Sequence, residues 1–154
     1  MIFTAEHIMN SLAGLLKAEY PEYPVYDSPN QQGTRFPCFF IFFMPSAVDS
    51  HVGDRFLRDL GIDIVFVQQR NLVNGNVRIH AIAQYLDEAL ELFPYSDGSA
   101  DPVMIRTFER QWKNEDMELH YQFHIRQRVA LPREEALMRE LEENHGYIKK
   151  DRWD

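Results

Sequence analysis

The stretch MELHYQFHIRQRVAL, residues 117–131, decides the fold of this chain. Its odd positions are apolar or aromatic except for Gln127, and its even positions are polar or charged up to Arg128. Successive side chains of a strand point to opposite faces, so this alternation predicts one long strand with one face in a core. The stretch is much longer than the usual ~5–6 residues of a strand. We therefore expect the strand to extend beyond its own sheet.

Four further strands are predicted around it. Residues 103–112 form its partner in a long antiparallel hairpin, because the polar segment 113–116 makes a tight reversal. The other three strands are predicted at 24–27, 37–44 and 55–69. The strand at 37–44 is nearly continuously apolar, and Pro45 is expected to end it. Gly61 is expected to mark a bulge or bend in the strand at 55–69.

Two helices carry apolar residues at three- and four-residue spacing, which indicates faces packed on the sheet. The first covers residues 4–20, with Thr4 as N-cap, and the second covers residues 77–93 and is closed by Pro94. We predict an α+β fold: a mixed or antiparallel sheet of four to five strands, two main helices packed on it, a long β-hairpin and an appended C-terminal helix.

The appended helix is predicted at residues 133–144, and its apolar stripe includes Leu137 and Leu141. A stripe this narrow buries little surface, so it predicts either docking on a neighbouring subunit or a solvated appendage. The chain is accordingly divided into an α+β domain, residues 1–131, and a C-terminal helix and tail, residues 132–154.

Composition restricts the partners of this chain. Among 154 residues, 45% are hydrophobic and 26% charged, and the net charge is −8 without a polybasic run. Such a balance disfavours an anionic membrane and sequence-specific nucleic-acid binding. The single cysteine, Cys38, lies in an apolar run and is expected to be buried and inert. No signal peptide is recognised, so a cytoplasmic location is expected.

No pattern of residues predicts catalysis. His120 and His124 are four residues apart, which on a strand separates their side chains by roughly 13 Å, too far for one metal ion. Asp59 and Asp63 have the same spacing and cannot form a catalytic carboxylate pair. Neither a phosphate-binding glycine loop nor a nucleophile elbow is present. We expect a non-enzymatic protein without cofactor or metal, whose two strand histidines are solvated or at an interface.

Basic residues gather on the long strands. They are Arg55, Arg58, Arg106, Arg110, Arg126 and Arg128. Charges on sheet edges discourage aggregation, and they also make contacts with acidic patches of a like subunit. Both interpretations are compatible with the sequence.

The N-terminal half carries the most specific likeness to a known family. A helix with Ile8-Met9-Asn10-Ser11-Leu12 leads to Tyr20-Pro21-Glu22-Tyr23-Pro24-Val25-Tyr26-Asp27. Gln31-Gln32-Gly33 and Pro37-Cys38-Phe39-Phe40-Ile41 follow. With the element order up to about Leu131, these segments resemble the tail terminator proteins of tailed phages and phage-like bacteriocins, in particular those of Gram-positive phages and defective prophages.

The resemblance implies a structural role in a phage or phage-like particle. The protein would form a homohexameric ring at the head-proximal end of the tail tube, end tube polymerisation and join the tail to the neck or head. Its partners would be further copies of itself and the tail tube protein, with sheath and neck or head-connector proteins as additional candidates, all met in the bacterial cytoplasm. We predict that segments 46–60 and 103–131 carry most of the subunit and tube contacts, whereas the tail after Pro132 is where this sequence departs from the family pattern. Candidate contact residues are Arg55, Arg58, Arg106, Arg110, His120, His124, Arg126, Arg128, Leu137 and Leu141.

Two alternatives remain open at this point. A neck or head-completion protein of the same particle has a similar small α+β sheet and ring symmetry. A ligand-binding α+β domain would instead be a monomer or dimer with an aromatic pocket beneath the second helix. The first is separated by the order of rings in the particle, and the second by a cavity in place of a filled core.

Overall fold

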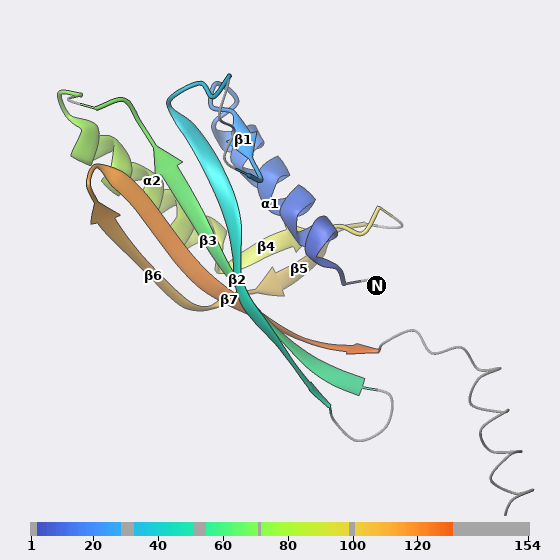
Figure 1. The fold of residues 1–154 in the computed structure, drawn as a ribbon. Helices are drawn as coiled ribbons and strands as arrows, with labels where there is room; N and C mark the ends of the chain where they lie inside the picture. The colour runs from blue at the N-terminus through green and yellow to red at the C-terminus, as the bar shows by residue number, and fades with distance from the viewer. Residues whose placement is uncertain (1–2, 29–32, 51–54, 71, 99–100, 131–154) are drawn as a thin grey trace, which may run out of the picture.

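The computed structural model describes residues 3–28, 33–50, 55–70, 72–98 and 101–130. It confirms the predicted α+β class, with two helices and a mixed sheet (Figure 1). The predicted helix at 133–144, with Leu137 and Leu141, lies outside these residues. In chain order the elements are α1 (Ala5–Glu19), β1 (Val25–Tyr26), β2 (Cys38–Ser50), β3 (Arg55–Val67), α2 (Gly75–Ala89), β4 (Leu92–Tyr95), β5 (Val103–Arg106), β6 (Phe108–Glu115) and β7 (Glu118–Ala130).

Five strands form the main sheet in the order β1-β2-β3-β7-β6. β1 is parallel to β2, and every other neighbouring pair is antiparallel. Strands β4 and β5 form a separate two-stranded sheet. Both helices lie on the same side of the main sheet, as Figure 1 shows, and their buried faces join one hydrophobic core with the strands. The opposite, helix-free face is covered by no described element.

Strand β7 confirms the prediction made from residues 117–131. Its odd positions from Leu119 to Ile125 are completely buried in the core, and its even positions face away from the helices. β3 pairs with it without interruption, from Arg55↔Ala130 to Val67↔Glu118. The alternation in the sequence therefore reflects burial of one face, as a half-covered sheet requires.

Pro45 does not end its strand, contrary to the prediction. β2 continues to Ser50, and its register with β3 shifts between Phe43 and Ser46, so that Pro45 lies within a β-bulge. A bulge leaves residues without a ladder partner, and a proline that lacks an N–H is tolerated there. Segment 46–50 is consequently part of a long hairpin with β3.

Gly61 does not mark a bulge in its own strand. β3 pairs with β7 without interruption past it, with Gly61 opposite His124, while β2 and β6 each carry a bulge at about this level of the sheet. Bulges increase local twist and bend a strand. Beyond this level the sheet continues as three strands that leave the body of the domain (Figure 1). We call this extension, residues 46–50, 55–60 and 125–130, the arm.

Gly61 leaves room for Met44, which lies in the irregular segment of the neighbouring strand β2. A Cβ on Gly61 would lie 2.8 Å from Met44 Cε, 3.0 Å from Met44 Cβ and 3.3 Å from His124 Cε1. We expect Gly61→Ala to lower the free energy of unfolding by about 1–3 kcal/mol, since overpacking forces neighbours to shift. Gly14 is the matched control, because a Cβ there meets nothing within 4 Å. Gly14→Ala should raise stability by about 0.5–1 kcal/mol through helix propensity. Urea unfolding of both variants checks this, and equal effects would contradict it.

The second helix is shorter than predicted. α2 ends at Ala89, and Leu92–Tyr95 is strand β4, in which Phe93 and Tyr95 are buried and Pro94 is exposed. Phe93 keeps the helical spacing of the residues before it, so the sequence pattern extends further than the helix. β4 pairs only with β5, and a two-stranded sheet leaves an edge where proline is allowed.

The predicted strand 103–112 is divided into β5 and β6, which belong to different sheets. The division falls at Thr107, whose buried hydroxyl donates a hydrogen bond to the carbonyl of Leu90 at 2.5 Å. This bond fixes the chain to the end of α2 where it passes from one sheet to the other. The long hairpin itself, β6 and β7, is confirmed.

Candidate assembly surface

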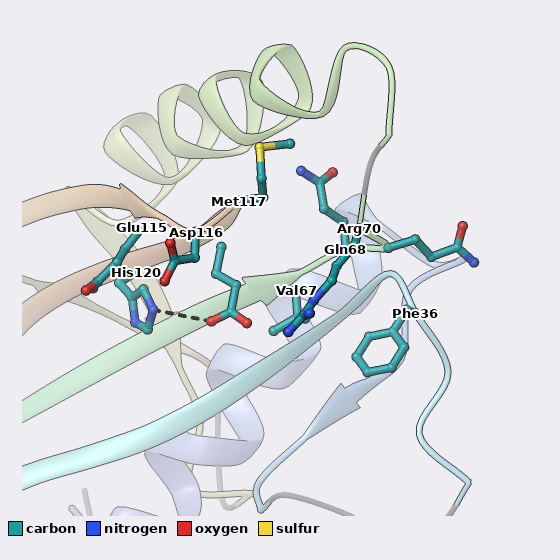
Figure 2. Close-up of a pocket in the computed structure, with 10 residues that line it drawn as sticks. Phe36, Val67, Gln68, Arg70, Glu115, Asp116, Met117 and His120 are labelled. Atoms are coloured by element: carbon teal, nitrogen blue, oxygen red, sulfur yellow. Dashed lines mark ion pairs between the residues drawn. The ribbon is translucent and has the colours of Figure 1, made fainter.

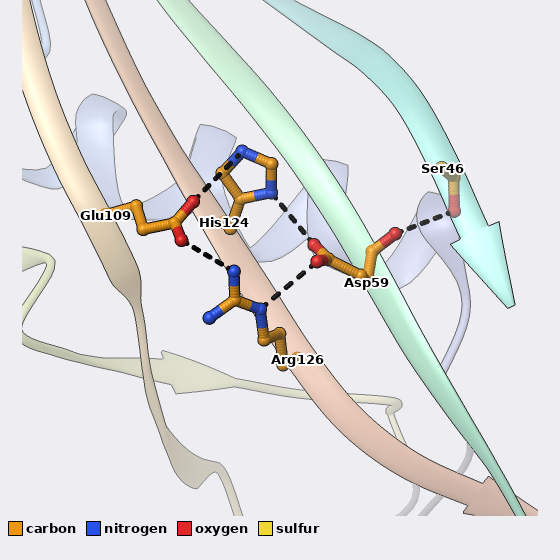
Figure 3. Close-up of polar contacts among 5 residues, drawn as sticks. All are labelled: Ser46, Asp59, Glu109, His124 and Arg126. Atoms are coloured by element: carbon orange, nitrogen blue, oxygen red, sulfur yellow. Dashed lines mark hydrogen bonds and ion pairs between the residues drawn. The ribbon is translucent and has the colours of Figure 1, made fainter. Parts of the chain in front are cut away.

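Four ionisable side chains form a connected network on the helix-free face (Figure 3). Asp59 Oδ1 lies 2.8 Å from His124 Nδ1, and Arg126 Nε donates to Asp59 Oδ2 at 3.1 Å. Arg126 Nη2 donates to Glu109 Oε1 at 2.8 Å, and the guanidinium carbon lies 5.5 Å from the centroid of the Phe108 ring. The network therefore ties β3, β7 and β6 together.

The position of this network follows from the register of the strands. Asp59 lies directly opposite Arg126, and diagonally opposite His124. The Ser46 hydroxyl donates to the Asp59 carbonyl at 3.1 Å, which adds β2 to the same level (Figure 3). Glu109 lies in the irregular segment of β6, where its φ is 54°, and its carboxylate accepts the hydrogen bond from Arg126. All four long strands are thus held at the base of the arm.

A second histidine repeats the arrangement closer to the other end of the sheet. His120 Nδ1 lies 3.4 Å from Asp63 Oδ2, and its Nε2 lies 3.6 Å from Glu118 Oε2. Sequence reasoning placed His120 and His124 on one face but missed their acidic partners. The usable signal was the equal four-residue spacing of Asp59 and Asp63, which matches the two histidines on a neighbouring strand.

The pKa of Asp59 is lowered in the folded protein. Burial by itself would raise this pKa, but hydrogen bonds and charges from His124 and Arg126 outweigh that cost. The depressed pKa means that the unfolded chain binds a proton more readily than the folded one. The stabilisation by ionised Asp59 is then complete above its ordinary pKa of about 3.9, and it is lost as the pH falls through the lower folded value.

We therefore expect Asp59→Asn to reduce the acid sensitivity of the fold. Below about pH 4 the wild type loses stability that the variant never had, so the difference between their melting temperatures should shrink as the pH falls. Thermal unfolding between pH 7 and 3 measures this difference. Asp101→Asn, at an exposed position outside the network, should stay parallel to the wild type. A gap for Asp59→Asn that is constant with pH would contradict the role of the carboxylate charge.

The remaining candidate residues do not converge on one site. Arg106 lies 3.7 Å from Glu91, with both side chains largely exposed. Arg110 lines a small hollow on the β6–β7 face together with Gln122 and His124. Arg55, Arg58 and Arg128 all belong to the arm. The structure thus divides the predicted basic set among β5, the β6–β7 hairpin and the arm.

The helix-side face of the arm is partly apolar and lies beyond the helices. Val48 is 50% exposed and Phe43, just before the bulge, is 39% exposed. Arg58 lies between Val48 and Gln127 in one row across the three strands. Its Nε is buried and has no hydrogen-bond partner within the described part of the chain. A protein surface that contacted this face would cover both apolar and donor groups.

A hollow among the described residues lies at the end of the sheet opposite the arm (Figure 2). It has a volume of about 770 Å³ and is open to solvent. Glu115, Asp116, Glu118 and Arg70 line it together with the rings of Phe36 and His120. It is therefore a charged hollow between strand ends, and differs from an aromatic pocket beneath α2.

Among the described residues, no cluster of three or more His, Cys, Asp or Glu side chains has the arrangement needed to hold a metal ion. No helix in this part of the chain is long and apolar enough to cross a membrane.

The family model described as "Phage tail terminator protein" matches residues 7–136, which include most of α1, all of α2, the whole main sheet and the arm. The chain belongs to the phage tail terminator family. No curated protein matches it. Membership supports a structural role in a phage tail, and it confirms the resemblance found in the N-terminal half of the sequence.

Proposed function

We propose that this tail terminator family protein forms a homohexameric ring on the head-proximal end of the tail tube. The ring stops tube polymerisation at the correct length and offers its other side to the neck or head. Assembly takes place in the bacterial cytoplasm, and the ring remains in the phage or phage-like particle. The partners are other copies of the chain, the tail tube protein and, in a contractile particle, the sheath.

The family match is the observation that carries this proposal, since it covers nearly all of the described fold. The arm adds physical support. Strands that extend beyond the core of a small domain expose backbone and side chains to another chain, and heterologous contacts close into a ring when the rotation between copies is right. The network of Asp59, Glu109, His124 and Arg126 supports the same idea, because it links β3, β7 and β6 at the base of the arm.

The packing beneath α2 argues against the ligand-binding alternative. Ile79, Ile82 and Leu86 are buried there, and Tyr121 and Phe123 are completely buried in the strand beneath. The Tyr121 hydroxyl donates to Asp87 at 2.6 Å, which satisfies the one polar atom of that side chain. A filled core is what a structural subunit needs, whereas a small-molecule site needs a largely enclosed apolar pocket.

Mass photometry and negative-stain microscopy of the full chain, alone and mixed with tail tubes of the same particle, test the proposal. We expect a ring at one end of each tube and no further tube growth after its addition. Rings bound only to neck or head structures would favour the head-completion alternative. A protein that stays monomeric and leaves tube ends free and growing would overturn the proposal.

A further inference from the structure

The two edges of the arm lack strand partners in the part of the chain that the structure describes. On one side, β1 pairs with β2 only at Phe39 and Phe40. On the other, β6 pairs with β7 no further along the arm than His124. The backbone of 46–50 and that of 125–130 are therefore open edges, which are templates for pairing with another strand.

The outer rows of the arm carry opposite charges. Asp49, Leu57 and Arg128 form one row across the three strands, on the helix-free face. Asp49 and Arg128 are both exposed, and neither makes an ion pair with any other described residue. The β2 edge is thus acidic and the β7 edge basic at the same height. One edge of the arm is complementary to the other edge of an identical arm.

Strand direction decides how such edges can meet. β2 and β7 are each antiparallel to β3, so they run parallel to each other. Rotation about a ring axis keeps the direction of each strand along that axis, and the β2 edge of one copy then meets the β7 edge of the next in parallel. A two-fold dimer would instead pair like edges in antiparallel fashion, and place Asp49 near Asp49 or Arg128 near Arg128.

We propose that neighbouring subunits of the ring join head to tail through a parallel strand junction between β2 residues 46–50 of one copy and β7 residues 125–130 of the next. The Asp49 side chain of one copy lies beside Arg128 of the adjacent copy. Pro45 sets the limit of the junction on β2, since its bulge ends the regular edge and it has no N–H to donate. The proposal rests on the ring function and names the contact that closes the ring.

Cysteine cross-linking tests the junction on rings bound to tail tubes. In the Asp49→Cys/Arg128→Cys double variant, oxidation should join subunits by disulfides into a ladder that ends at the closed ring, as neighbouring parallel strands lie only ~4.8 Å apart. The two cysteines of one copy are two strand spacings apart, which is too far for a disulfide within the subunit. Each single variant should give no covalent dimer. The native Cys38 does not interfere because it is fully buried, and burial raises the pKa of its thiol to about 11.

Charge exchange provides the independent readout. Asp49→Arg alone and Arg128→Asp alone should each reduce the fraction of capped tubes by roughly tenfold, and the double exchange should restore it. A dimer from a single cysteine variant would overturn the proposal in favour of a two-fold contact. Absence of cross-links in capped rings, followed by their appearance after truncation at residue 130, would show that the chain's own C-terminal segment occupies the edge. If wild-type protein caps no tubes, the ring function fails first, and that outcome is separate from failure of the junction.

Discussion

Phe39→Ala should destabilise the fold by about 3–5 kcal/mol, because it removes a large buried ring from the centre of an aromatic cluster. The Phe39 ring is completely buried, and its centroid lies 5.1 Å from that of Phe66 and 5.6 Å from that of Tyr20. Tyr20 in turn contacts Tyr85 of α2 edge to face, at 5.5 Å. The cluster therefore connects the end of α1, two strands and α2. A cavity there removes packing contacts between the sheet and both helices.

Phe40→Ala is the matched control for this prediction. Phe40 is the next residue of the same strand but lies on the helix-free face, where its half-buried ring contacts Tyr26 and Phe42. Truncation there opens no enclosed cavity, so the loss should be well below that of Phe39→Ala. Urea unfolding of both variants gives the two free energies. Equal losses would mean that the aromatic cluster does not form the centre of the core.

The burial of whole faces is what the sequence predicts best. In β7, alternation from Leu119 to Ile125 corresponds to four fully buried side chains, because each polar residue between them points away from the helices. The first helix is equally well predicted, and Thr4 caps it as expected by accepting a hydrogen bond from the His7 N–H at 3.2 Å. In both elements a single period describes the contacts of the entire segment.

The wrong predictions concern residues whose local sequence pattern fits one element while their tertiary contacts place them in another. Phe93 continues the helical spacing of α2, yet it is buried as part of β4. Pro45 suggests the end of a strand, and only the register with β3 reveals that it lies in a bulge. Thr107 divides β5 from β6 through a hydrogen bond to Leu90, a residue distant in sequence. These features depend on tertiary contacts that no local pattern contains.

The charge network was beyond prediction for a related reason. Its residue types were recognised, but the pairing of Asp59 with His124 and Arg126 requires the register between β3 and β7. These strands are separated by a helix and a second sheet, so turn geometry cannot determine their register. The same holds for the row of Asp49, Leu57 and Arg128, which becomes visible only once three strands are aligned.

Replacement of residues 48–58 by a two-residue Asn-Gly turn should abolish tube capping while the body of the domain stays folded. Ala47 and Asp59 lie directly opposite each other, so an Asn-Gly turn can join them as a tight hairpin. None of the described side chains removed is fully buried, whereas Asp59 and its partners are kept. The variant should keep a cooperative thermal transition and leave tube ends free in negative-stain images.

A point substitution tests the role of the arm without shortening the chain. Val48→Asp places an unpaired charge on the helix-side face of the arm, and burying it against a partner is unfavourable. We expect roughly tenfold fewer capped tubes, while Val48→Thr, which keeps the branched shape, has a much smaller effect. Val77→Asp is the matched control, since Val77 is 66% exposed on α2, away from the arm. If Val48→Asp and the shortened variant both cap tubes as the wild type does, the arm does not contact the tube or the neighbouring subunit, and the ring must be built from other surfaces.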